Sequence, residues 1–86
     1  MMRLVQSVDQ AQYLVNSINT LYETLDTELV LGVDCEGLIK GHPLSLIQIS
    51  VADDVYVIDL YYVNPFEYGL KEIMENPYII KVFHDF

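Results

Sequence analysis

The spacing of apolar residues changes near residue 28, and this change constrains the fold more than any other feature of the sequence. Before it, apolar residues recur at helical spacing and predict one amphipathic helix over residues 8–25. They are Ala11, Leu14, Val15, Ile18, Leu21, Tyr22 and Leu25. Ser7 followed three residues later by Gln10 is a capping-box pattern for the start of that helix. Beyond residue 28 the apolar runs are of strand type, so we expect a mixed α/β fold.

Three strand-forming runs follow, over residues 29–35, 44–51 and 55–60. Only the sequence ADD at 52–54 separates the last two, which predicts an antiparallel hairpin. Residues 37–43, GLIKGHP, contain two glycines and a proline and should connect the first run to the second. The three runs therefore predict an antiparallel meander. Residues 3–6 have the composition of a further short strand.

A second helix should begin after Asn64, with Asn64 as its cap and Pro65 at its first position. Its expected buried stripe is Phe66, Leu70, Ile73 and Met74, and the Asn76-Pro77 pair should end it. The last stretch, YIIKVFHDF, is rich in β-branched and aromatic residues and predicts a strand. A strand–helix–strand connection implies that this strand runs parallel to a neighbour. If that neighbour is 29–35, His84 and Asp85 come close to its end.

Length and composition limit the function. A chain of 86 residues forms at most one domain, and 52% hydrophobic residues with a mean hydropathy of +0.27 is high for so short a chain. This suggests either a very dense core or a piece of a larger protein. We favour the piece because of the C-terminal motif described below, and the length excludes a complete large enzyme. No apolar run reaches the roughly 18 to 20 residues of a membrane span, and the N-terminus, MMRLVQSVDQ, has no secretory pattern. A single cysteine fits a reducing compartment, so we expect an intracellular protein, nuclear or cytoplasmic.

The charge is strongly negative, with 13 acidic against 4 basic residues and a formal net charge of -9. This argues against binding nucleic acid, whose phosphates need cations. A metal-dependent nuclease escapes the objection, because divalent cations neutralise its carboxylates and also hold the phosphate. Most of the acids should simply lie on solvated faces, namely Glu23, Asp26, Glu28, Glu67, Glu72 and Glu75.

One acidic pair interrupts an apolar strand, in the run LVLGVDCEGL. Side chains two residues apart in a strand share a face, so Asp34 and Glu36 should stand together while Val33 and Cys35 face the other way. Paired carboxylates are hard oxygen ligands suited to Mg²⁺ or Mn²⁺. The spacing alone leaves two readings open, a metal site or a solvated strand end.

The motifs LVLGVDCEGL, LSLIQIS, VYVIDL and KVFHD together resemble the ribonuclease D-like 3′-to-5′ exonuclease domain of the DEDD superfamily, over residues 29–86. The resemblance is greatest to the subgroup with a V-D-C-E-G first motif and a K-V-x-H-D second motif. It implies a ribonuclease H-like fold and hydrolysis of nucleotides from a single-stranded 3′ end, of RNA more than DNA, with two Mg²⁺ or Mn²⁺ ions. It implies that Asp34 and Glu36 are catalytic metal ligands. Gly37, without a Cβ, would let a nucleotide approach the backbone or would simply form a turn.

The resemblance also implies that the chain lacks part of the catalytic set. The third acid of the family lies a few residues beyond the position of His84, past Phe86, and Asp85 matches a variable position. The fourth acid and the Tyr or His that positions water lie on a later helix. We therefore expect residues 1–86 to be the N-terminal portion of an exonuclease domain, incomplete and inactive. The alternatives are a non-catalytic RNA- or protein-binding adaptor of the same fold, and an acidic protein-interaction piece with an open sheet edge; no particular protein partner is indicated.

Other polar and aromatic residues have ordinary structural explanations. We expect Asp59 to bind a loop backbone, Cys35 to be a small buried residue and His84 to be structural rather than a base. The seven tyrosines form no stripe, so core packing and half-buried surface should account for most of them. The sequence leaves open which face Gln48 occupies. Lys40 and His42, in the 37–43 segment, are weaker candidates for a phosphate contact.

Overall fold

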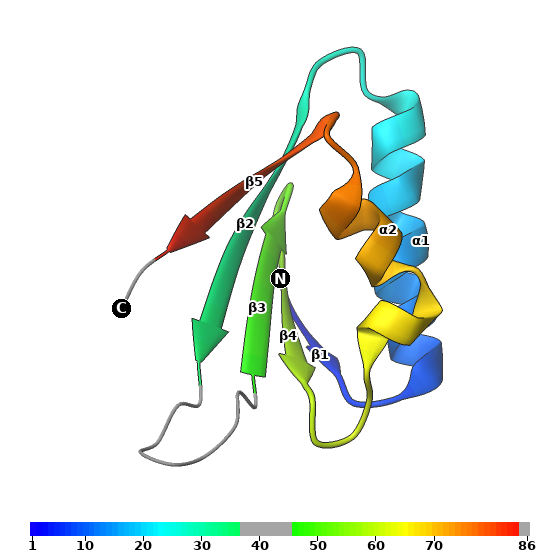
Figure 1. Cartoon of the computed structure of the whole chain (residues 1–86), viewed down its shortest axis with the longest axis vertical. Coiled ribbons are helices and arrows are strands. Elements are labelled where there is room, and N and C mark those ends of the chain that lie inside the picture. The colour runs from blue at the N-terminus through cyan, green and yellow to red at the C-terminus, as the bar shows by residue number, and fades with distance from the viewer. Residues whose placement is uncertain (37–45, 85–86) are drawn as a thin grey trace.

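The computed structural model describes residues 1–36 and 46–84, which form five strands and three helical segments (Figure 1). In chain order they are strand β1 (Met2–Val5), helix α1 (Val8–Thr24), strands β2 (Leu29–Glu36), β3 (Leu46–Val51) and β4 (Asp54–Asp59), the 3₁₀ helix η1 (Pro65–Tyr68), helix α2 (Leu70–Glu75) and strand β5 (Ile79–His84). The order of helices and strands confirms the α/β expectation.

The strands form one mixed sheet in the order β1-β4-β3-β2-β5. Strand β3 pairs in antiparallel fashion with β2 on one side and with β4 on the other, which confirms the predicted meander. Strand β5 pairs in parallel with β2, as the strand–helix–strand connection predicts. Strand β1 forms the opposite edge, parallel to β4, and begins one residue before the expected segment.

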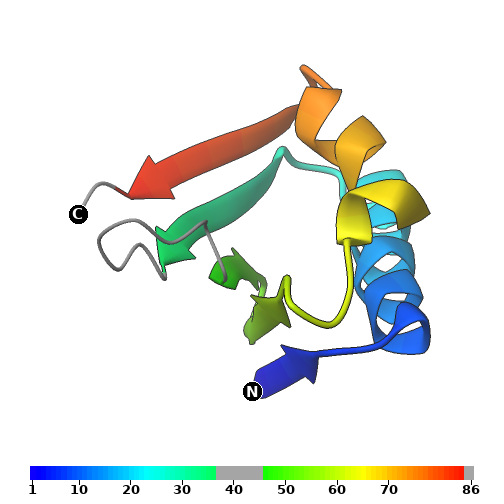
Figure 2. The same ribbon diagram turned by 60° about the horizontal axis from the view of Figure 1, so that its bottom comes forward.

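The helices lie on one face of this sheet, and Figure 2 shows the two layers from the side. We call this the covered face and the other the open face, because no helix of the described segments lies on the latter (Figures 1 and 2). Alternate residues of the strands point into the covered face, and most of them are buried there. The strand contribution to this core is Val5, Leu29, Leu31, Val33, Ile47, Ile49, Val51, Tyr56, Ile58 and Ile79.

Helix α1 begins as its capping pattern predicts. The Ser7 side chain accepts a hydrogen bond from the Gln10 backbone N–H at 3.2 Å. The Gln10 side chain in turn accepts one at 2.7 Å from the N–H of Gln6, the residue before the cap, rather than from the cap itself. Ala11, Leu14, Val15 and Ile18 are buried against the sheet and Leu21 is partly buried, which confirms this part of the predicted stripe. Tyr22 and Leu25, expected in the same stripe, are exposed, because the helix ends at Thr24.

The second helical region differs from the single helix expected from the sequence. Asn64 caps it as predicted, accepting a hydrogen bond from the Phe66 N–H at 3.1 Å, but the first turn is 3₁₀ and Gly69, with φ 111°, separates it from α2. A Cβ at Gly69 would lie 2.8 Å from a methyl carbon of Val15. The break therefore brings the backbone close to α1, at a position where only glycine fits.

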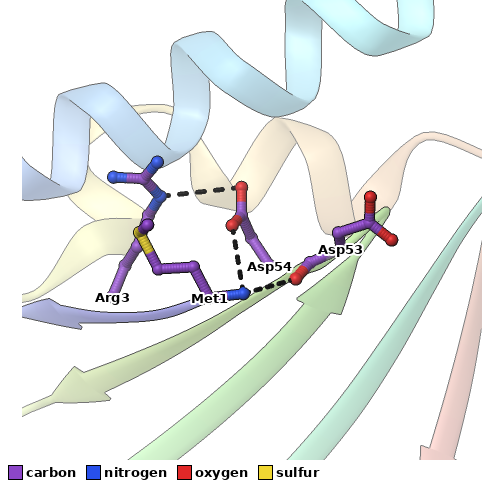
Figure 3. A network of polar contacts seen from close by, with 4 residues as sticks. All are labelled: Met1, Arg3, Asp53 and Asp54. Atoms are coloured by element: carbon purple, nitrogen blue, oxygen red, sulfur yellow. Dashed lines mark hydrogen bonds and ion pairs between the residues drawn. The ribbon is translucent and has the colours of Figure 1, made fainter.

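The N-terminus fastens the edge strand β1 to the β3–β4 turn (Figure 3). The Met1 amino group donates a hydrogen bond to the Asp53 carbonyl at 2.6 Å and lies 3.6 Å from an Asp54 carboxylate oxygen. The other Asp54 oxygen lies 3.6 Å from Arg3 Nε, and the Arg3 guanidinium lies 5.1 Å from the centre of the Tyr13 ring. These contacts are at the end of the sheet opposite to Glu36.

Candidate functional site

The acidic pair lies on the open face, at the carboxyl end of β2. In that strand Leu31 and Val33 are buried on the covered face, and the alternation places Asp34 and Glu36 together on the other one. This confirms the predicted division of the strand. Cys35 points away from the acids, as expected, but is half-buried rather than buried, because it lines a shallow apolar pocket near the end of the sheet.

Asp34 has a neighbour on each side in the sheet. It pairs with Gln48 of β3 and with His84 of β5. Gln48 alternates with the buried Ile47 and Ile49, so it lies on the open face beside Asp34, which answers the question that the sequence left open. The expected closeness of His84 to the strand end is confirmed by the register. Asp85, Gly37, Lys40 and His42 lie outside the described residues.

One oxygen of the Asp34 carboxylate, Oδ1, is buried without a hydrogen-bond partner in the described residues. A buried carboxylate oxygen is costly unless a cation or a donor compensates it. Glu36 lies two residues further along the same face, so the two carboxylates form a donor set that fits a hard divalent cation. Residues 1–36 and 46–84 contain no group of three His, Cys, Asp or Glu side chains arranged to hold a metal.

Asp59 ends β4 and has the structural role that the sequence predicts. Its carboxylate accepts a hydrogen bond from the Tyr61 N–H at 3.1 Å, and its carbonyl accepts from the N–H groups of Tyr62 and Val63 at 3.1 and 3.3 Å. It pairs with Leu46, which pairs with Glu36 on its other side. Asp59 is thus two strands from Glu36, about 10 Å at ordinary strand spacing, and is not part of the acidic pair.

The tyrosines are more exposed than the sequence suggests. Tyr56 is buried and Tyr68 is half-buried, but five are exposed, so the expectation that core packing and half-buried surface account for most of them is wrong. The exposed ones are Tyr13, Tyr22, Tyr61, Tyr62 and Tyr78. No pattern in the sequence distinguishes them, because tyrosine has both an apolar ring and a polar hydroxyl and suits either location.

The acids that were expected on solvated faces are exposed to solvent. They are Glu23, Asp26, Glu28, Glu67, Glu72 and Glu75. Among the helices of the described segments, none is long and apolar enough to cross a membrane.

Solved structures of exonucleases share this fold. Escherichia coli RNase D, described as an exoribonuclease involved in structured RNA processing, superposes with a TM-score of 0.78 at 20% identity, over 98% of this chain and 21% of its own. The catalytic core of RRP6 from Trypanosoma brucei gives 0.75 at 24% identity, over 98% and 22%. The EXD2 exonuclease domain soaked in Mg gives 0.72 at 22% identity, over 93% and 42%. The fold is therefore that of the ribonuclease H-like exonucleases.

The family assignment agrees with the fold. A model of the 3′-5′ exonuclease family matches residues 3–86, nearly the whole chain, and the chain belongs to that family. No curated protein matches the sequence. The chain spans about a fifth of the length of the RNase D and RRP6 structures and less than half of the EXD2 domain.

Proposed function

We propose that the chain is the N-terminal portion, residues 1–86, of a metal-dependent 3′-to-5′ exonuclease domain that acts on nucleic acid, with Asp34 and Glu36 as metal ligands. The observation that carries this proposal is the pair of carboxylates on the open face of β2, one with a buried oxygen that has no partner in the described residues. Membership of the 3′-5′ exonuclease family supports the reaction, and the two carboxylates support the choice of metal ligands.

The residues of the chain would bind and orient the reacting groups. Asp34 and Glu36 would hold Mg²⁺ or Mn²⁺, which when bound polarises the phosphate and the attacking water. Strand β2 positions both carboxylates: at Asp34 it pairs with β3 on one side and β5 on the other, and at Glu36 it pairs with β3. The choice of metals is supported by the EXD2 exonuclease domain, which was soaked in Mg and in Mn with GMP.

The substrate we propose is a single-stranded 3′ end, of RNA more than DNA, and we propose that the protein works inside the cell, in the nucleus or cytoplasm. The support is the description of Escherichia coli RNase D as an exoribonuclease. Because two carboxylates alone hold a divalent ion weakly, we expect this chain to hydrolyse nucleic acid little or not at all. The part of the matched structures that it does not span is where the other ligands would lie.

The proposal is tested by titrating the chain with Mn²⁺ and counting bound ions by electron paramagnetic resonance. Weak binding is expected in the wild type, and it should be lost in the double variant Asp34→Ala, Glu36→Ala. A matched control is Glu23→Ala, Asp26→Ala, which removes the same charge from exposed positions. Equal Mn²⁺ binding in the wild type and the Asp34, Glu36 variant would contradict the proposal.

A non-catalytic adaptor is the second candidate. It would keep the same fold and bind RNA or a protein without catalysis. An adaptor would bind RNA equally well in EDTA and in Mg²⁺, with or without Asp34 and Glu36. The exonuclease proposal expects Mg²⁺ to tighten binding, and expects that gain to disappear in the double variant.

A further inference from the structure

Two adjacent tyrosines stand out on the surface. Tyr61 is 85% exposed, more than any other aromatic side chain of the described residues, and Tyr62 is 62% exposed. Their rings pack edge to face, with centroids 5.2 Å apart and an interplanar angle of 80°. This is a favourable geometry for two aromatic rings, and it leaves ring faces free.

The backbone that carries the two rings is held firmly. Asp59 accepts three hydrogen bonds from the turn, one from Tyr61 to its carboxylate and two from Tyr62 and Val63 to its carbonyl. Val63 is buried and Leu60 packs against the core, so the pair is anchored on both sides. The tyrosines are thus presented on a hydrogen-bonded turn, and little backbone conformational entropy would be lost when a ligand binds them.

The turn lies at the same end of the sheet as the acidic pair. The carboxyl end of β4 and the carboxyl end of β2 both meet the start of β3, because Leu46 pairs with Asp59 on one side and with Glu36 on the other. Figures 1 and 2 show the ends of β2 and β4 at one edge of the molecule. Tyr78, which is 75% exposed, precedes β5 and lies at the opposite end.

We propose that Tyr61 and Tyr62 form a stacking platform for the bases of a single-stranded nucleic acid whose backbone reaches Asp34 and Glu36. Stacking on aromatic rings holds any base, because every base has a π-face, and it requires no positive charge. That suits a chain with a net charge of -9, which attracts phosphates poorly. The inference rests on the proposed function, since it concerns the substrate of that same site.

The test is the binding of a fluorescently labelled single-stranded RNA to the full chain in EDTA, followed by anisotropy. Tyr61→Ala and Tyr62→Ala should each weaken binding by about 5- to 150-fold, the range for loss of one base–aromatic stack. The double variant Tyr61→Phe, Tyr62→Phe should retain wild-type affinity, because stacking needs the ring and not the hydroxyl. Tyr78→Ala is the matched control and should change nothing, since it removes an equally exposed tyrosine at the far end of the sheet.

An RNA of the same length with abasic sites tests whether the tyrosines contact the bases. It keeps the phosphates and loses the bases, so it should bind more weakly than the intact RNA and be insensitive to Tyr61→Ala. The proposal is overturned if the wild type does not bind the RNA, if the alanine variants bind it normally, or if Tyr78→Ala weakens binding equally. Alanine variants that alter only self-association, measured by sedimentation, would indicate a protein interface instead.

The two proposals fail separately. Mn²⁺ binding by Asp34 and Glu36 does not involve the tyrosines. If the chain binds Mn²⁺ as expected but the tyrosine variants bind RNA as tightly as the wild type, only the stacking platform is rejected. If Asp34 and Glu36 do not bind Mn²⁺ but RNA binding still depends on the tyrosines, the metal-dependent exonuclease is rejected and an RNA-binding surface is retained.

Discussion

The two faces of the sheet are made by the same strands and differ completely in character. On the covered face of β2, Leu29, Leu31 and Val33 are at most 5% exposed and pack against the helices. On the open face the same strand carries Val30, which is 48% exposed, and then the two carboxylates. Alternate residues of one strand therefore stabilise the fold, while the residues between them present the carboxylates on the open face.

The neighbouring strands repeat this division. In β3, Ile47 and Ile49 are buried on the covered face, while Gln48 lies beside Asp34 on the open face. In β5 the division holds at the start, where Ile79 is buried and Ile80 is 38% exposed, and it fades toward the end, where Phe83 on the covered face is 61% exposed. The difference teaches that substitutions on the open face can change binding with little effect on folding, because the core does not include them.

The largest effect is expected on the covered face of β2. Leu31→Ala removes a fully buried side chain from the central core and should lower the free energy of unfolding by about 2–5 kcal/mol. This is much of the stability of a small domain, so the variant should be partly unfolded at room temperature. Urea denaturation followed by circular dichroism measures the change.

Val30→Ala is the control for the open face, since Val30 is the next residue of the same strand and is half exposed. It should cost about 1 kcal/mol or less. If Val30→Ala destabilised the protein as much as Leu31→Ala, the open face would belong to the core, and the division between the faces would be wrong.

A smaller effect is expected from adding one methyl group to two glycines. Gly69→Ala places a Cβ 2.8 Å from a Val15 methyl at a φ of 111°, so it should cost about 1–3 kcal/mol. Gly32→Ala, on the open face of β2, meets nothing closer than 3.4 Å, the Cβ of Ser50, and should change stability little. Thermal unfolding of the two variants gives the comparison, and an equal loss in both would show that the open face is packed as tightly as the helix layer.

Much of the fold follows from periodicity in the sequence. The stripe of α1, the β2–β3–β4 meander and the parallel β5 were all predictable, because each depends on local spacing and on connection rules. The break at Gly69 was not, since its cause is the approach of Val15 from another element, which the local sequence does not contain.

The site shows the same limit. Alternation along β2 was enough to place Asp34 and Glu36 together, because it depends on one strand alone. Alternation with Ile47 and Ile49 gives the face of Gln48, but its position beside Asp34 depends on the register between β2 and β3. The exposure of Tyr61 and Tyr62 depends on where the turn meets the layers, so neither of these could be deduced from local pattern. The roles of Asp34 and Glu36 as metal ligands stay predictions until metal binding is measured.

The smallest expected effect has the opposite sign. Asp34→Asn should raise the stability of the metal-free protein by about 1 kcal/mol, because it removes the charge of a half-buried carboxylate whose buried Oδ1 has no partner among the described residues, and removes its repulsion with Glu36. Urea denaturation in EDTA measures the gain, with the exposed Asp53→Asn as a control that should stay near the wild type. In Mg²⁺ the wild type should gain stability by binding the ion and the variant should not. If Asp34→Asn were less stable than the wild type in EDTA, the carboxylate would be supporting the fold, and the open face would share the structural work that we assign to the covered one.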